Sequence, residues 1–397
     1  MNARTALLGA VLPAALLASC TSSPPRYPAS EVSELERYAT DDAARRSFLE
    51  ASLLTRENGY AKLRLDRYRD GAWWSLKEWN PPAREVREED LGSKTDRGAY
   101  AALPDADVAW TENSMAALGE RAFFTYPLQI VTGFQDVLRD VASAKQAGLW
   151  IDQGRVGGLV WVRLPDGRRD IAMTCSTCHA SVVNGKLVPG RNNPDIDFRA
   201  LSNEALVYPG TVDVTADDTD NPVAITDLRP IRYQKYLHHT GMLRNSLPAL
   251  AVRIETLAIT SSAESVRPPR KLAAAMAYYL WRLAPATPPD LPNTPGAALF
   301  RRECGACHAG PELRGESVSL SAVGTDPAVG NGSERRTGNY RVPSLRFLSD
   351  RSRLFASGAV PNAIELMNPS RTATGHRYGL ALSEEERAQL VAFLLKL

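Results

Sequence analysis

Two segments of the chain repeat the pattern Cys-x-x-Cys-His, at positions 175–179 and 304–308. Two thiols separated by one helical turn can form thioether bonds with both vinyl groups of a porphyrin, and the histidine that follows can ligate the iron. The residues that would do this are Cys175, Cys178, His179, Cys304, Cys307 and His308. The pattern therefore predicts two covalently bound haem c groups, with His179 and His308 as the proximal iron ligands.

Two other uses of these thiols fit part of the pattern. A zinc ribbon takes four cysteines, but its two pairs lie much closer together along the chain. A redox-active pair of cysteines needs no histidine after it. The chain has five cysteines, and the fifth, Cys20, lies in the N-terminal segment, so none is left for a disulfide. Because neither alternative explains a histidine after both pairs, the pattern favours haem.

The ligand on the distal side of each iron decides what a haem can do. A second strong ligand gives a six-coordinate electron-transfer centre, whereas an open position lets the iron bind peroxide or dioxygen. The chain has five histidines, so the candidates are few. Those after the first motif are His238, His239 and Met242, with Met276 less favoured because its helical spacing is typical of a core residue. Surface or supporting roles for the two histidines also stay open.

After the second motif, the distal candidates are His376 and Met367. We favour His376, since a histidine between glycines in a loop has few structural reasons to exist, whereas Met367 follows apolar Ile364 and could belong to the core. Haem also brings two carboxylates, which a guanidinium can bind with two parallel hydrogen bonds. Arginines crowd this part of the chain, and Arg341 and Arg346 are the candidates for that role.

The elements around the motifs predict a mainly α fold with tandem cytochrome c domains. Apolar residues at helical spacing indicate a largely helical N-terminal region over 31–155. Alternating residues over 158–173, with a turn at 165–167, predict a short β-hairpin that leads into the first motif. Thr294 as a cap and Pro295 in the first helical position predict a helix before the second motif.

An amphipathic helix is expected after each motif, at 271–283 and at 383–397, the second opened by a capping box of Ser383 and Glu386. A proline-rich stretch at 284–295 marks the join between the haem domains. The expected boundaries are 1–19 for a signal peptide, 20–30 for a tether, 31–155 for the N-terminal region, 156–288 for the first haem domain and 289–397 for the second.

The start of the chain predicts export. Arg4 precedes an apolar run over 6–18 that is too short to span a bilayer but suits a secretory signal peptide. The run ends at Cys20 in a segment that resembles the lipobox of bacterial lipoproteins, where the cysteine is lipidated. This predicts a periplasmic protein anchored by lipid to a membrane, most simply the outer membrane. The alternative is a soluble periplasmic protein whose signal contains a cysteine.

Composition adds little to function. Hydrophobic residues make up 44% of the 397 residues and charged residues 23%, which is ordinary for a globular protein. The formal net charge is +2, so no strongly basic character favours nucleic-acid binding.

Several segments resemble the bacterial di-haem cytochrome c peroxidase superfamily, which also includes methylamine-dehydrogenase-maturing enzymes and rubber oxygenases. These segments are the two haem motifs, 340–346 (YRVPSLR), Gly358, 382–386 (LSEEE) and the terminal 390–397. The likeness is good over 296–397, weaker over 173–283 and absent before that. The resemblance implies one electron-transfer haem and one reactive haem in electronic contact.

The chain departs from that superfamily in two places. Its usual His-Asp-Gly element is replaced by 356–358 (ASG), while 239–241 (HTG) looks like a degenerate copy in the first domain. The resemblance implies a methionine ligand at the electron-transfer haem, a place that Met367 could fill in competition with His376. No catalytic acid or base can be carried over.

Three functions fit these observations. The first is electron transfer through two six-coordinate haems to or from a redox partner protein. The second is reduction of hydrogen peroxide at one open haem, which we expect at the first motif, with the His308 haem supplying electrons. The third is a haem sensor or an assembly subunit, suggested by the large region without a haem motif.

Overall fold

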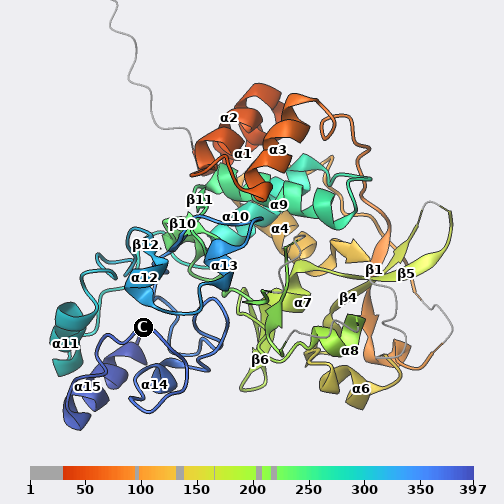
Figure 1. Cartoon of the computed structure of the whole chain (residues 1–397). Helices are drawn as coiled ribbons and strands as arrows, with labels where there is room; N and C mark the ends of the chain where they lie inside the picture. The colour runs from red at the N-terminus through yellow and green to blue at the C-terminus, as the bar shows by residue number, and fades with distance from the viewer. Residues whose placement is uncertain (1–29, 94–97, 131–137, 165, 203–207, 216–220) are drawn as a thin grey trace, which may run out of the picture.

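The computed structural model describes the chain except for residues 1–29, 94–97, 131–137, 165, 203–207 and 216–220 (Figure 1). The predicted signal peptide, Cys20, the tether as far as residue 29 and Pro165 of the hairpin turn lie outside the described residues. Among the described helices, none combines the length and the apolar character needed to cross a membrane.

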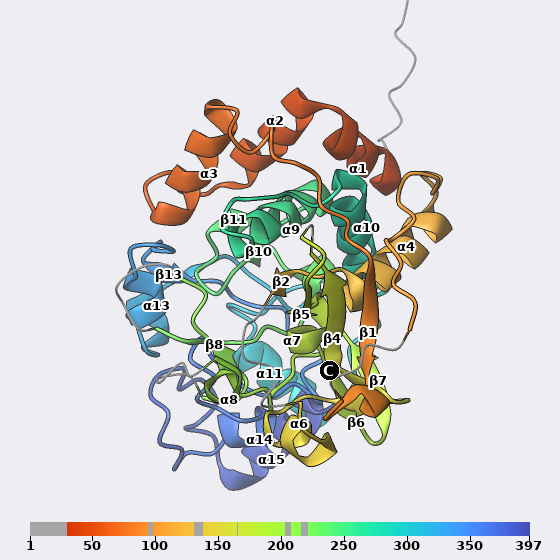
Figure 2. The same cartoon turned by 90° about the vertical axis from the view of Figure 1, so that its right-hand side faces the viewer.

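The N-terminal region begins with three helices that cover the helical core of the molecule. They are α1 (Glu31–Thr40), α2 (Asp42–Ser52) and α3 (Gly59–Arg69). Each begins at a residue whose side chain accepts a hydrogen bond from a backbone N–H of the first turn: Ser30, Asp41 and Asn58. Figure 2 shows these helices lying over α9 (Leu247–Ser261) and α10 (Arg270–Trp281).

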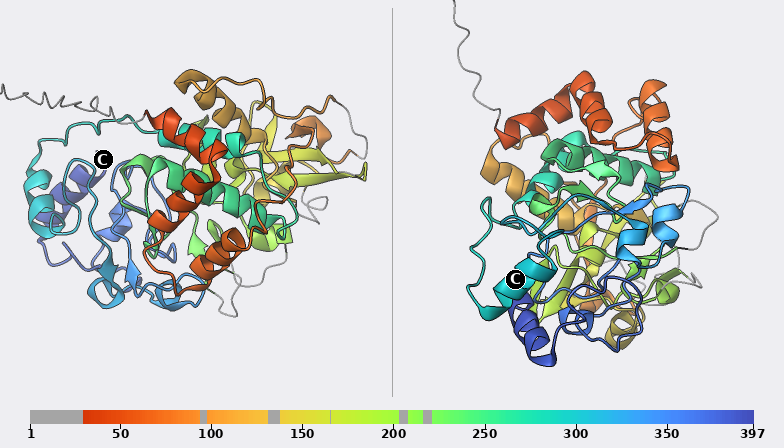
Figure 3. Two further views of the ribbon diagram at one scale, coloured as in Figure 1. Left: turned by 90° about the horizontal axis from the view of Figure 1, so that it is seen from above. Right: turned by 60° about the vertical axis from the view of Figure 1, so that its left-hand side comes forward.

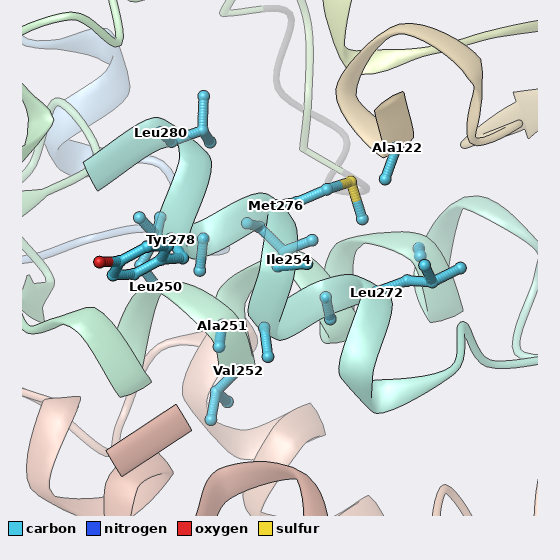
Figure 4. Close-up of a cluster of buried hydrophobic side chains, with 14 of the residues drawn as sticks. Ala122, Leu250, Ala251, Val252, Ile254, Leu272, Met276, Tyr278 and Leu280 are labelled. Carbon is cyan, nitrogen blue, oxygen red and sulfur yellow. The ribbon is translucent and has the colours of Figure 1, made fainter. Parts of the chain in front are cut away.

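The largest hydrophobic core lies between α9, α10 and α4 (Glu112–Thr125). Leu272 and Met276 of α10 are fully buried there, with Ala122 of α4 and Ile254 of α9 beside them (Figure 4). The expected amphipathic helix over 271–283 is therefore confirmed as α10. The long α9 was missed because it is apolar on most sides, as expected for a helix buried all round.

An antiparallel sheet stands beside this core and carries the first motif. Its strand order is β1-β4-β5-β2, with β3 paired to β4, and every pairing is antiparallel. The hairpin expected over 158–173 is confirmed, because Leu159 lies opposite Met173. The strands are β1 (Ala83–Arg87), β2 (Gln129–Ile130), β3 (Ile151–Asp152), β4 (Arg155–Arg163) and β5 (Arg169–Met173).

Several short elements complete this part of the chain. The strand pairs are β6 (Ala180–Val183) with β7 (Lys186–Pro189), β8 (Thr211–Val212) with β9 (Val223–Ala224), and β10 (Tyr236–Leu237) with β11 (Leu243–Arg244). The short helices are η1 (Glu88–Asp90), α6 (Val141–Gln146), α7 (Cys175–His179), α8 (Phe198–Ser202) and η2 (Ile231–Tyr233).

The prediction of a mainly α fold needs correction, because the described chain contains one five-stranded sheet and several two-stranded ones. The sheet also unites regions that were expected to be separate. Strand β1 comes from the expected helical N-terminal region, yet it pairs with β4 of the hairpin. Short strands separated by polar segments carry little periodicity, so the sequence pattern could not reveal this pairing.

The C-terminal region is built on two helices, α11 (Pro295–Glu303) and α15 (Glu384–Leu394), which lie side by side (Figure 3). The rings of Phe300 and Phe393 lie 5.1 Å apart between them. The capping box of Ser383 and Glu386 is confirmed. Thr294 precedes α11 as expected, but its hydroxyl makes no capping hydrogen bond. Other elements are α12 (Leu320–Val323), α13 (Ala328–Asn331), α14 (Ala363–Leu366) and the strands β12 (Val318–Ser319) and β13 (Asn339–Tyr340).

Candidate haem-binding sites

The first motif forms a single helical turn, α7, held directly against strand β4. Thr174 caps this turn, and its hydroxyl donates to the carbonyl of Gly158 at 2.8 Å. The hydroxyl of Thr177 donates to the same carbonyl at 3.0 Å. Gly158 has a φ of +65°, and a Cβ placed there would lie 2.2 Å from the Ser176 hydroxyl. Only glycine lets the strand approach the motif this closely.

The second motif follows the end of helix α11 instead. Cys304 is the C-cap of that helix, with its N–H donating to the carbonyl of Phe300 at 2.8 Å. The N–H of His308 donates to the carbonyl of Cys304 at 2.9 Å, which makes one further helical turn through the motif. The second motif is thus carried by a helix, as expected, whereas the first depends on a sheet.

Both motif histidines have the protonation that an iron ligand needs. The Nδ1–H of His179 donates to the carbonyl of Thr226 at 2.9 Å, and that of His308 donates to the carbonyl of Leu313 at 3.2 Å. A carbonyl can only accept, so each ring carries its proton on Nδ1 and keeps Nε2 free as a ligand atom. Burial lowers the pKa of both histidines to about 4, so both are neutral at pH 7.

The thiols fit thioether formation better than the alternatives. All four motif cysteines are free. Burial raises the pKa of both thiols of the first motif, Cys175 and Cys178, to about 12, whereas a reactive redox pair keeps one thiol pKa low. Cys175 packs against the helical core, and Cys304 packs against the separate core of the C-terminal region. A zinc site shared by both cysteine pairs would require the two pairs to lie together, whereas they pack against different cores.

A cavity of about 270 Å³ lies beside the second motif. Its wall contains both thiols and the imidazole of that motif, with Phe300 and Leu394 as apolar neighbours. These residues provide what a covalently held porphyrin needs, namely two attachment points, one axial imidazole and an apolar lining. The second site therefore fits haem c.

The two distal candidates of the second motif both line this cavity. His376 has a φ of +43° and lies between two aromatic rings, with Phe355 at 5.8 Å and Tyr378 at 5.4 Å between ring centroids. Within the described chain, its buried Nδ1 atom has no hydrogen-bond partner. Met367 is also buried, but it belongs to the core cluster of the C-terminal region. A buried ring nitrogen without a partner favours His376.

The two adjacent histidines after the first motif point to different surroundings. The Nε2 atom of His238 accepts a hydrogen bond of 2.9 Å from Nε of Arg253, and its ring packs edge-on against Tyr60. The Nε2–H of His239 donates to the carbonyl of Ala224 at 3.0 Å. His239 lines the cavity of the second motif. The structure thus brings His239 to the second site, although we had expected it to serve the first.

The methionines considered for the first iron are core residues. Met242 is 1% exposed and Met276 is fully buried, both in the helical core. The low expectation for Met276 as a ligand agrees with this position.

The two arginines expected to bind haem carboxylates have different roles. Arg341 lines the cavity, and one of its Nη atoms donates to the carbonyl of Tyr236 at 3.3 Å. Arg346 instead donates to the carbonyls of Pro311, at 2.9 Å from Nε, and Pro289, at 2.6 Å from Nη2. These bonds attach the proline-rich join to the second haem segment, so we assign Arg346 a structural role. Arg351 also lines the cavity, and no sequence signal distinguished it from its neighbours.

Comparisons with known proteins give weak likenesses only. No family model and no curated protein sequence matches the chain. Among solved structures, a chain of hydrazine synthase from Kuenenia stuttgartiensis is 14% identical, with a TM-score of 0.36, over 77% of this chain and 98% of that one. A MauG-like protein associated with microbial copper homeostasis is 16% identical, with a TM-score of 0.26, over 57% of this chain and 83% of that one.

Proposed function

We propose that this protein is a di-haem c-type cytochrome that transfers single electrons. The observation that carries the proposal is the pair His308 and His376 on the wall of one cavity next to two attachment cysteines. Haem iron held by two strong axial ligands exchanges one electron at a time without binding a substrate. Burial lowers the pKa of both imidazoles, so both are neutral ligands at physiological pH.

The surrounding chain supports this role. The carbonyls of Leu313 and Thr226 hold the Nδ1 protons of the two motif histidines, which orients each ring and raises its basicity toward iron. Apolar residues such as Phe300 and Leu394 line the second site. The polarity of the residues around a haem is one of the features that set its redox potential.

Spectroscopy of the purified protein tests the proposal. We expect two haems per chain, low-spin electron paramagnetic resonance signals only, and no carbon monoxide binding by the ferrous protein. A high-spin ferric signal or ready binding of carbon monoxide would contradict the carrier function. The variant His376→Ala should convert one haem to high spin, whereas the control Met367→Leu should leave both spectra unchanged. The reverse outcome would identify Met367 as the ligand.

A second function is favoured by the hydrogen bonds of His238 and His239. The Nε2 atoms of both imidazoles already have hydrogen-bond partners, Arg253 for His238 and the carbonyl of Ala224 for His239. We therefore propose peroxide reduction at the first site as the alternative. There, hydrogen peroxide would take up two electrons and two protons to give two waters, with the electrons delivered by a redox partner through the second site. Carbon monoxide binding to only one haem of the unaltered protein would support this alternative, provided that this haem still binds carbon monoxide in His376→Ala.

We also propose a periplasmic location, with a lipid anchor at Cys20 holding the protein at the outer membrane. The lipobox-like segment before Cys20 is the observation behind this proposal. Replacement of Cys20 by serine should release the protein from membranes into the soluble periplasmic fraction. A protein that stays with the membrane after this change would contradict the lipid anchor.

A further inference from the structure

Four arginines from distant parts of the chain converge around His238. Arg64 lies on α3, Arg253 on α9, Arg335 after α13, and Arg341 after β13. Burial, followed by the positive charges of all four, holds the pKa of His238 well below its usual range. The guanidinium carbon of Arg64 lies 3.4 Å from the ring centroid of Tyr60, and that of Arg253 lies 5.9 Å from it.

This arginine cluster has less negative charge than positive charge. The negative charge of Glu334 raises the pKa of Arg64 and of Arg335. Burial and the neighbouring cations nevertheless lower the pKa of both arginines, to about 10 for Arg335. Like charges packed in a poorly solvated place repel one another strongly. A buried group of this kind normally has an anionic partner.

Two guanidinium atoms of the cluster are ready to bind such a partner. The Nη1 atom of Arg253 and the Nε atom of Arg335 are buried, and neither has a hydrogen-bond acceptor among the described residues. One further nitrogen of each group is in use: Nε of Arg253 donates to His238 at 2.9 Å, and Nη2 of Arg335 donates to the carbonyl of Val214 at 2.8 Å. These bonds fix the positions of both guanidinium groups, so the free atoms are preorganised.

The cluster lies near the first motif. Helix α9, which carries Arg253, contributes Leu250 and Ile254 to the same core against which Cys175 packs. His238 of the cluster is followed by His239, whose Nε2 atom lies 3.5 Å from the hydroxyl of Thr226, and the carbonyl of Thr226 accepts from His179 of the first motif at 2.9 Å. An anion held by Arg253 would therefore lie beside the first site.

We propose that Arg253 and Arg335 bind a carboxylate of the first haem. This inference rests on the proposed function, because it requires a haem at Cys175 and Cys178. A carboxylate accepts from two guanidinium groups at once and would satisfy both unpaired atoms. It would also supply the negative charge that the cluster lacks. A free oxyanion such as phosphate has the same chemistry, so the test must separate these two sources.

Redox potentiometry of the full-length protein provides the test. The variants Arg253→Gln and Arg335→Gln remove one positive charge each beside the first haem, and Arg336→Gln removes an exposed charge one residue away as a matched control. Loss of a nearby cation stabilises ferric iron, so each test variant should lower the midpoint potential of one haem and leave the other unchanged. The control should shift neither. Arg335→Lys, which keeps the charge, should shift the potential less than Arg335→Gln.

The haem that responds should be the one whose spectrum changes in His179→Met. Loss of the guanidinium should also raise the carboxylate pKa, so that the lowered potential becomes more dependent on pH between 5 and 8. If both test variants carry two haems and match Arg336→Gln, the inference is wrong. If the potentials are unchanged while phosphate raises the melting temperature of the unaltered protein but not of Arg253→Gln, the site takes a free anion and the haem assignment is wrong. A protein without any haem would instead overturn the proposed function.

Discussion

The two haem motifs have the same chemistry but are held by different frameworks. The first lies on a sheet, where the carbonyl of Gly158 accepts from two threonine hydroxyls and the strand touches the motif. The second follows a helix and faces a cavity that contains a further imidazole, His376, whose Nδ1 atom has no hydrogen-bond partner among the described residues. A five-residue motif therefore determines how a cofactor is attached, and the surrounding elements determine what its iron can do.

The segment 226–229 connects the surroundings of the first motif with those of the second. The carbonyl of Thr226 accepts from His179 of the first motif, and Thr226 itself lines the cavity of the second. The neighbouring Asp227 binds Arg229, whose guanidinium also donates to Asp350 at 2.7 Å. Any change in this segment should therefore affect both sites together.

The largest expected effect is loss of one haem. Replacing both cysteines of the second motif, in Cys304→Ser with Cys307→Ser, should halve the haem content measured by the pyridine haemochrome assay. The matching change at Cys175 and Cys178 should remove the other half, and it should also reduce the yield of folded protein, because this motif lies inside the core. Equal yields for the two double variants would contradict the contrast between the two frameworks.

A second effect concerns the buried charge that supports the first region. Glu255 on α9 is 1% exposed and accepts from Tyr38 at 2.8 Å and from Arg270 at 3.2 Å. Glu255→Gln removes the buried negative charge beside Arg45 and Arg270, which then keep only the exposed carboxylate of Asp42, and it should lower the free energy of unfolding by roughly 3–5 kcal/mol.

Chemical denaturation measures this loss, and Glu50→Gln is the matched control. Glu50 forms an exposed ion pair with Arg46 and should change stability by less than about 1 kcal/mol. Since α9 carries Arg253, the change at Glu255 should disturb the first haem spectrum more than the second. An unchanged stability would mean that this network does not hold the N-terminal helices in place.

A third effect tests the close approach of strand β4 to the first motif. Gly158→Ala places a methyl group against Ser176 in a left-handed backbone conformation, which should cost about 3 kcal/mol. Gly167→Ala is the control, because Gly167 has a similar φ of +82° but no atom within 4 Å of its added Cβ. It should cost only about 1 kcal/mol. Equal losses would show that backbone strain alone, and not the packing of the motif, explains the glycine.

The smallest expected effect depends on pH and concerns His239, which lies between the regions. Burial lowers its folded pKa to about 4, whereas an unfolded histidine has a pKa of about 6.5. Between pH 7 and pH 5 the unfolded chain therefore gains a proton that the folded protein does not, so stability falls by up to about 2 kcal/mol. His239→Gln should lose less stability over this range. A change in either haem spectrum would mean instead that His239 reaches an iron.

Local spacing accounts for what could be predicted from the sequence. Each correct structural prediction depended on residues within one helical turn or two adjacent strands. These predictions were the motif residues, the hairpin before the first motif and the helices α10, α11 and α15. The capping box at Ser383 and Glu386 is such a short-range pattern, and the structure contains it. The prediction of haem attachment is also local, because it depends on two thiols and a histidine within five residues.

Tertiary packing decided the rest. No local pattern separates His238 from His239, yet one accepts from Arg253 on α9 and the other lines the second cavity. Arg341 and Arg346 belong to the same segment, 340–346, but only Arg341 of the two lies on the cavity wall. The physical reason is that burial and hydrogen-bond partners come from segments far apart in the chain. The sequence by itself therefore determined which residues can hold haem, and only the tertiary structure decided which side chains surround each motif histidine.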